Sequence, residues 1–349
     1  MYLPVLGCVG TAKNTGKTTA LTAILQEARR RGYRVALTSI GYDGEELDNL
    51  TGLPKPRVEV HAGDLVGTAR PCLEKSPLGW DLLADCGVST ALGPLVVARV
   101  TSPGRVILAG PAHRRGLGRL CRLLAARQES DLLLVDGAFG RLSPLGRAQG
   151  LVISTGAARS VDPEVLGREV HALTRLFSLP RHRLQGCRLR HLQSEDECRV
   201  AARLLAGGQT VLILGMVTLA GLAWLADMIS GMEAGKGWGW LLFAHPVQLL
   251  LAGPAERVLE MVYRLESLGP GLAVVGGPAI LAVTVNPFYP RLLGPNRFRA
   301  ARLDASQLKA RVAEHVGSQI PVIDVKRDGP EQLGQVVEDW LLGRRPSPT

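Results

Sequence analysis

The chain has 349 residues, enough for one large or two medium domains, and its apolar fraction of 46% is ample for a buried core. The net charge of +10 would permit binding to nucleic acid or to an acidic protein surface, but no RNP, zinc-finger or basic-zipper pattern accompanies it, so nucleic acid is not expected. Six cysteines without a C-x-x-C pair argue against a disulfide framework or a zinc site and indicate a cytoplasmic protein with reduced thiols. The N-terminus leads directly into an apolar run, so we expect no signal peptide.

The first predicted elements are a buried strand over residues 3–9 and a helix over residues 20–28, joined by a polar loop that ends in Gly16-Lys17-Thr18. Strand, glycine-bounded loop, Gly-Lys-Thr and helix together predict a phosphate-binding loop. Its backbone N–H groups and the open helix N-terminus converge on one spot and stabilise an anion there. We expect Lys17 to reach the β- and γ-phosphates and the Thr18 hydroxyl to ligate Mg²⁺.

The spacing of this loop departs from the usual G-x4-GK[ST], because position 11 is Thr11 and the nearest glycine is Gly10. The longer form GTxxxxGKT is similar to the loop of dethiobiotin synthetase and its relatives among the P-loop ATPases and GTPases. The alternative is a glycine turn before an ordinary helix. The residues that we expect to bind the nucleotide here are Gly10, Thr11, Lys13, Asn14, Thr15, Gly16, Lys17, Thr18 and Thr19.

A second strand, residues 33–39, completes a βαβ unit and ends in Ile40-Gly41-Tyr42-Asp43-Gly44-Glu45. Ligands of parallel sheets bind beyond the carboxyl ends of the strands. We therefore predict Asp43 as a metal ligand or a catalytic, water-positioning group, with Glu45 as a less certain companion. An Asp-Gly turn is an equally weighted alternative.

The stretch from residue 51 to 80 is rich in Pro and Gly and is expected to be a loop with one short strand at 58–61. The basic run His113-Arg114-Arg115 could contact phosphate or a partner, although a solvated helix start is the favoured interpretation. The elements expected in this part of the chain are a helix near 81–92, strands at 95–100 and 105–109, and a helix over 116–127.

A strongly apolar strand, residues 131–135, is followed by Asp136-Gly137. Apolar residues and then an acid form the Walker B pattern, whose carboxylate helps to hold Mg²⁺. The alternative is an Asp-Gly turn, but a P-loop upstream favours the metal-binding interpretation of Asp136. The next strand, 151–153, ends in the small polar turn Ser154-Thr155-Gly156, which suits the edge of a nucleotide or a helix cap.

Residues 178–192 are basic and irregular, and we place a boundary there. It separates a P-loop nucleotide-binding domain (1–180) from a C-terminal α/β half (190–343) that could be continuous with the first, followed by a tail (344–349) expected to be disordered. The uncharged stretch 207–226 is as long as a membrane span of about 20 residues. Its glycines favour a buried strand–helix pair instead.

A late strand, residues 280–285, ends in Asn286. An asparagine amide both donates and accepts hydrogen bonds, so Asn286 could bind a nucleobase edge, although a turn is at least as plausible. The predicted fold is therefore an α/β, P-loop NTPase-type, mostly parallel sheet flanked by helices, with a second α/β half.

Several segments in order resemble one family: GTAKNTGKTTALT, TSIGYDGEELD, LLLVDGAFGR, LVISTGA, AVTVNPFYP and IPVIDV. Over residues 5–326 the chain is similar to the reactivase subunit of lysine 5,6-aminomutase (KamB). The family follows its acidic motif with Asp-Arg, whereas this chain has Phe139-Gly140-Arg141, which puts the role of that neighbouring loop in doubt.

The resemblance implies an ATP- and Mg²⁺-dependent helper that lets damaged cobalamin exchange out of an adenosylcobalamin-dependent aminomutase of lysine fermentation, together with a second, MutS-like ATPase subunit. GTP is not excluded, and the oligomeric state stays open. One alternative is a ligase of the dethiobiotin synthetase type, in which Lys13 would lie near the γ-phosphate. Others are a nucleotide switch that inserts another cofactor, and a nucleic-acid-associated ATPase.

Overall fold

The computed structural model describes residues 3–41, 58–138, 146–233, 235, 237–294 and 297–343. The chain divides into two compact units, and each has its own sheet. The first unit combines Met1–Gly167 with Ile280–Thr349, and the second is Arg168–Ala279. The boundary expected within residues 178–192 differs from this division, because the last fifth of the chain, from Ile280 onward, belongs to the first unit.

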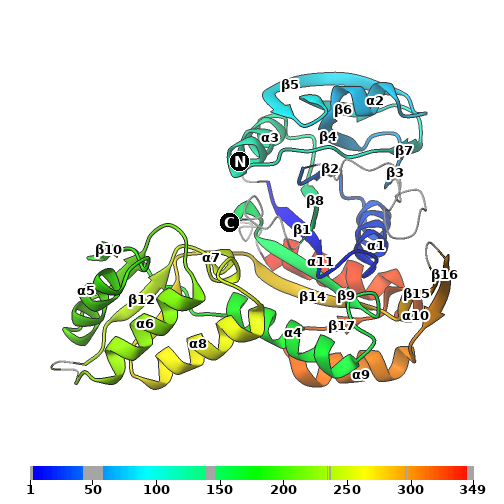
Figure 1. Cartoon of the computed structure of the whole chain (residues 1–349). Coiled ribbons are helices and arrows are strands. Elements are labelled where there is room, and N and C mark those ends of the chain that lie inside the picture. Colours follow the sequence, from blue (N-terminus) through cyan, green and yellow to red (C-terminus); the bar gives the residue numbers. More distant parts are fainter. Residues whose placement is uncertain are drawn as a thin grey trace. The chain divides into compact units, whose positions relative to one another are not determined.

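The first unit is built on a nine-stranded, mostly parallel sheet (Figure 1). The expected fold class is confirmed by this sheet and its flanking helices. β1 pairs in parallel with β8 and β9, and β2 pairs in parallel with β8 and β4, whereas β6 is antiparallel to β4 and β5. In spatial order the strands are β17 (Val322–Ile323), β14 (Ala279–Asn286), β9 (Gly150–Gly156), β1 (Val5–Gly10), β8 (Leu132–Ala138), β2 (Val35–Ser39), β4 (Leu65–Ala69), β6 (Gly93–Val100) and β5 (Trp80–Thr90).

Every residue of β1 is buried, which fits a central strand covered on both faces and explains its continuous apolar run. Helices α1 and α11 pack together, since a Cβ added at Gly334 would lie 2.5 Å from Glu27 Cβ. Two short antiparallel pairs, β3 (Val58–Val60) with β7 (Gly104–Val106) and β15 (Phe288–Gly294) with β16 (Arg297–Arg302), accompany the sheet. The helices of this unit are α1 (Lys17–Arg30), α2 (Arg70–Glu74), α3 (Arg114–Arg127), the start of α4 (Pro163–Phe177), α9 (Ala305–Val316), α10 (Val325–Asp328) and α11 (Pro330–Gly343).

The second unit is a four-stranded parallel sheet whose strands lie side by side in chain order. Its buried core includes Leu241 and Phe243 of β12 and Leu222 and Leu225 of α6. The stretch 207–226 forms a strand and most of a helix, as the sequence predicted. The elements are β10 (Arg188–Arg190), α5 (Glu195–Ala206), β11 (Val211–Ile213), α6 (Leu219–Ser230), β12 (Trp240–Phe243), α7 (Pro246–Leu250), α8 (Ala255–Ser267) and β13 (Gly271–Val274).

Two expectations about local structure are wrong. The stretch 51–80 was expected to be a loop with one short strand, but it also contains β4 (Leu65–Ala69), which joins the large sheet, and α2 (Arg70–Glu74). Residues 81–92 were expected to be helical, but β5 (Trp80–Thr90) is an antiparallel partner of β6. Register shifts after Leu82 and Asp85 interrupt the alternation of its side chains, so the apolar spacing imitates a helix. The tertiary pairing of the two strands overrides that local pattern.

All six cysteines are free thiols, as expected. In the described part of the chain, none of the helices combines the length with the apolar character that crossing a membrane requires.

Candidate functional site: a phosphate-binding loop and the hollow beside it

The loop between β1 and α1 turns sharply at two residues. Asn14 has a φ of 62° and Gly16 a φ of 91°, both in the left-handed region, where glycine pays no steric penalty. Gly16 precedes the first residue of α1, Lys17, and no side-chain hydrogen bond caps this helix among the described residues. The open N–H groups of its first turn therefore face the loop and suit an anion.

Gly10 is also required by space. A Cβ at this position would lie 2.7 Å from Thr15 Oγ1, and that hydroxyl donates to the carbonyl of Ala12 at 2.9 Å. The loop therefore folds back closely over the end of β1. This close contact explains why position 10 is a glycine, although it lies one residue further from the Gly-Lys-Thr triplet than the glycine of the usual motif.

The end of β9 fixes the other side of the loop. The Thr11 N–H donates to the Ser154 carbonyl at 2.9 Å, and the Thr11 hydroxyl donates to Thr155 Oγ1 at 3.2 Å. Further along the sheet, Ser154 Oγ and Thr284 Oγ1 share a buried hydrogen bond of 2.8 Å. Because β1, β8 and β9 are parallel neighbours, their carboxyl ends lie together at one end of the strands. Gly10 of β1 is paired with Ala138 of β8 and with Ser154 of β9.

The two charged groups predicted for phosphate and metal face each other. Lys17 Nζ lies 2.8 Å from Asp136 Oδ1, and each side chain is about a quarter exposed, at 26% and 24%. Asp136 is placed by register, opposite Ser39 of β2 and Cys8 of β1. Thr18 follows Lys17 in the first turn and is partly buried.

Cys8 lies beneath this pair and is inert. Burial raises the pKa of its thiol far above the usual range, the carboxylate of Asp136 raises it further, and the ammonium of Lys17 opposes the shift. A thiol held in the neutral form is neither a nucleophile nor a metal ligand. The available chemistry therefore comes from Lys17, Thr18 and Asp136. A hydroxyl and a carboxylate are ligands that Mg²⁺ accepts together with phosphate oxygens and water.

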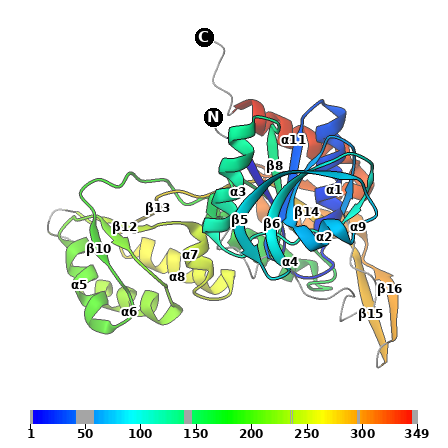
Figure 2. The same ribbon diagram turned by 90° about the horizontal axis from the view of Figure 1, so that it is seen from above.

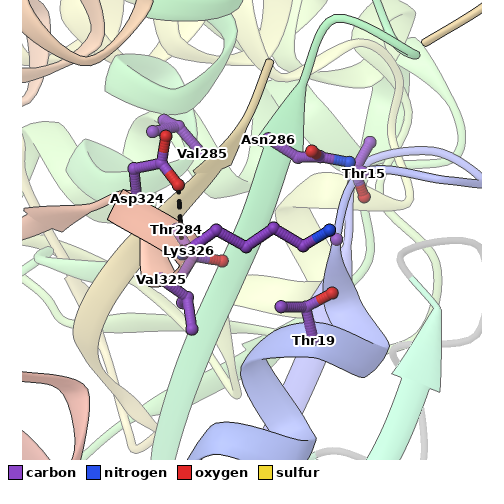
Figure 3. A pocket seen from close by; sticks show the side chains of 9 residues that line it. Thr15, Thr19, Thr284, Val285, Asn286, Asp324, Val325 and Lys326 are labelled. Carbon is purple, nitrogen blue, oxygen red and sulfur yellow. Dashed lines mark hydrogen bonds between the residues drawn. The ribbon is translucent and has the colours of Figure 1, made fainter. Parts of the chain in front are cut away.

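A hollow opens beside the loop, between the start of α1 and the ends of β14 and β17 (Figure 3). Asn286 forms part of its wall and holds the loop: its Nδ2 donates to the Asn14 carbonyl at 2.9 Å, and its Oδ1 accepts from Phe288 N–H at 3.2 Å. Figure 3 shows the side chain of Lys326 extending across the hollow toward Thr15. The lining residues are Thr15, Gly16, Thr19, Thr284, Val285, Asn286, Asp324, Val325 and Lys326.

Sequence reasoning missed the β17 side of this hollow. Asp324 is buried at 3% exposure, and its Oδ1 accepts from Lys326 N–H at 3.2 Å at the start of α10. The signal was present, because Asp324 follows a short apolar strand just as Asp136 follows one. Only the return of β17 to the first sheet brings Asp324 and Lys326 beside Thr19.

The remaining predicted residues lie outside the described part of the chain or have exposed side chains. Asp43 and Glu45 lie outside the described residues. Lys13 and Asn14 are exposed. The run 113–115 is exposed at the start of α3, which is the solvated helix start that the sequence favoured. Among the described residues, no group of three or more His, Cys, Asp or Glu side chains could hold a metal without further ligands.

Comparison with known proteins adds little to this geometry. No protein-family model matches the chain, and a search of curated proteins finds no match. Among solved structures, the MinC:MinD cell division protein complex of Aquifex aeolicus is similar over 99% of this chain and 98% of that chain, at 11% identity and a TM-score of 0.30. The structure of pNOB8 ParA bound to nonspecific DNA is similar over 76% of this chain and 99% of that chain, at 14% identity and a TM-score of 0.25.

These TM-scores are too low to carry an argument about fold or function. The class of protein is defined instead by the structure itself: a mostly parallel α/β sheet with a P-loop at the end of its central strand.

Proposed function

We propose that this chain is a magnesium-dependent P-loop ATPase that serves as the reactivation subunit of an adenosylcobalamin-dependent lysine 5,6-aminomutase. The observation that supports the nucleotide part is the 2.8 Å approach of Lys17 Nζ to Asp136 Oδ1 beside the open N-terminus of α1. An ammonium group there complements a polyphosphate, and a carboxylate complements its metal ion.

Each residue has a distinct task in this proposal. The N–H groups of the loop and of the first turn of α1 bind phosphate oxygens, and Lys17 binds the β- and γ-phosphates. Thr18 and Asp136 hold Mg²⁺, which neutralises charge on the phosphates. The nucleoside occupies the hollow between Thr19 and Asn286, where the Asn286 amide can both donate to and accept from a base edge.

The helper role rests on the resemblance of the sequence segments to the reactivase family. In this proposal the partners of the chain are the aminomutase and a second, MutS-like ATPase subunit. When a nucleotide binds, its phosphates add negative charge at the carboxyl end of the sheet, and hydrolysis removes part of that charge. P-loop proteins use this change to shift a segment between two conformations. A protein that opens another enzyme for cofactor exchange needs such a change between two conformations. The alternative of a small-molecule ligase needs a carboxylate substrate instead.

The test is a reactivation assay with the purified aminomutase holoenzyme after it has inactivated during turnover. Fresh adenosylcobalamin, Mg²⁺, the MutS-like subunit and this chain are added with ATP or GTP, and recovered mutase activity is measured. Lys17→Ala should lower nucleotide affinity and reactivation at least about 100-fold, because one preorganised donor at a transferring phosphate is lost. It should leave turnover by the undamaged mutase unchanged.

Arg115→Ala serves as the control, since it removes an exposed cation at the start of α3 and should reactivate normally. Reactivation that survives Lys17→Ala contradicts the proposal. Stoichiometric ATP turnover by the isolated chain with a small carboxylate, without any effect on the mutase, would replace it with the ligase function.

A further inference from the structure

A two-stranded hairpin, formed by β15 and β16, projects from the first unit (Figure 2). Its strands pair antiparallel from Phe288 opposite Arg302 to Gly294 opposite Arg297. No third strand of the described chain joins this pair. An isolated two-stranded hairpin is only marginally stable in water, so a partner that binds this arm would stabilise it.

The hairpin carries charge of one sign. Residues 287–303 contain four arginines and no acidic residue. Arg291 lies directly opposite Arg299, and both are exposed. Like charges directly opposite each other destabilise a strand pair. Neither of them, nor Arg302, forms an ion pair with a carboxylate of the described residues, so the arm presents unneutralised cations to an anionic partner.

The remaining side chains indicate the class of that partner. Phe288 is 38% exposed, and the guanidinium of Arg302 lies 5.1 Å from the centre of its ring. Of the side chains that accompany Arg at phosphates and base edges, residues 287–303 contain only Tyr289 and Asn296 and no Lys, Ser, Thr or Gln. Exposed aromatic rings with arginines are instead typical of the energetic centre of protein–protein interfaces.

The base of the hairpin is connected to the nucleotide hollow. Phe288 N–H donates to Asn286 Oδ1 at 3.2 Å, and Asn286 Nδ2 donates to the Asn14 carbonyl of the loop at 2.9 Å. Lys326 lines the hollow, and its Nζ lies 5.3 Å from the centre of the Phe288 ring. A ligand in the hollow therefore contacts the residues that hold the first residue of β15.

From these observations we propose that the β15–β16 hairpin is a docking arm for a protein surface that presents carboxylates around an apolar patch. Docking itself stands on the charge and composition of the arm. Its response to nucleotide rests on the proposed function, because it requires a nucleotide in the hollow beside Asn286 and Lys326.

The test variant is Arg299→Glu. It reverses one charge of the arm while giving Arg291 an oppositely charged neighbour, so the hairpin should gain stability rather than unfold. The matched control is Arg115→Glu, which makes the same charge change at an exposed position in the first turn of α3, where an acid is favourable.

Binding is measured by fluorescence anisotropy with a labelled peptide of alternating glutamate and tryptophan, with a 20-base-pair DNA duplex as competitor. The same variants are then tested for binding to the aminomutase holoenzyme. Arg299→Glu should weaken peptide binding about tenfold or more, since an attraction becomes a repulsion, while Arg115→Glu should change it less than about twofold.

Equal weakening by both variants overturns the proposal, and so does a duplex that binds the arm more tightly than the peptide. Holoenzyme binding that Arg299→Glu leaves intact overturns it as well. The proposed function fails separately: Arg299-dependent peptide binding without any aminomutase binding or reactivation leaves the docking arm in place and removes the aminomutase as its client.

Discussion

Asn286 is the residue through which the end of β14 controls the phosphate-binding loop, and its removal gives a measurable prediction. Asn286→Ala deletes the Nδ2 donor that holds the Asn14 carbonyl at 2.9 Å and the Oδ1 acceptor that holds Phe288 N–H at 3.2 Å. The Cβ remains, and it is this atom that lies 3.0 Å from the Cβ position of Gly16. Packing against the loop is therefore kept while its polar tether is lost.

The magnitude follows from these two bonds. Each bond contributes about 1 kcal/mol net, and one of them holds the carbonyl of Asn14, a residue in the left-handed conformation. In the variant the untethered loop relaxes when no nucleotide is bound, and binding of Mg-ATP must restore its conformation, so the affinity falls by up to about 2 kcal/mol, or about 30-fold in Kd. Asn286→Asp should also weaken binding, because it keeps the acceptor for Phe288 but directs a carboxylate oxygen at the Asn14 carbonyl.

The assay is titration calorimetry with Mg-ATP on wild type, both Asn286 variants and Gln307→Ala, which removes an exposed amide outside the hollow. Urea unfolding of the same samples verifies that each variant is folded. A Kd for Asn286→Ala within about twofold of wild type would refute the reasoning, since it would mean that neither bond matters to nucleotide binding.

The P-loop could be recognised from the sequence because its chemistry is local. An apolar strand, a glycine-bounded loop and Gly16-Lys17-Thr18 lie within one short stretch, and Asp136 follows an equally plain apolar run. The approach of Lys17 to Asp136 then requires only that β1 and β8 be parallel neighbours, which the rule on the carboxyl ends of strands anticipates.

The rest of the site depends on contacts between residues far apart in the chain. Asp324 and Lys326 reach the hollow only because β17 pairs with β14 at one edge of the first sheet. No local pattern announces that a chain leaves a unit near residue 167 and returns near residue 280. For the same reason the sequence placed one boundary where the structure has two crossings.

The β15–β16 hairpin was missed for a different physical reason. Its strands contain Pro290 and several arginines and lack a regular apolar face, so periodicity did not indicate a strand pair. Strands with exposed side chains on both faces are specified by register and by partners rather than by burial.

Two further predictions concern the stability of the first unit. Gly334→Ala should lower the free energy of unfolding by about 1–3 kcal/mol, because the new Cβ would lie 2.5 Å from Glu27 Cβ and would push α11 from α1. Gly343→Ala, in the same helix with no atom within 4 Å, should change it little, and equal urea midpoints for the two variants would contradict this packing. Hydrogen bonding from Arg30, opposed by desolvation and assisted by its charge, holds the pKa of the buried Glu27 carboxyl below its usual value. The folded chain therefore binds fewer protons than the unfolded chain, so this contribution is complete above a pH of about 4.5 and is lost as the pH falls toward the folded pKa. In urea titrations at pH 7, 5 and 4, Glu27→Gln should be less stable than wild type at pH 7 and should lose less stability than wild type between pH 5 and 4. Equal losses of unfolding free energy in wild type and Glu27→Gln would mean that folding does not lower the pKa of Glu27.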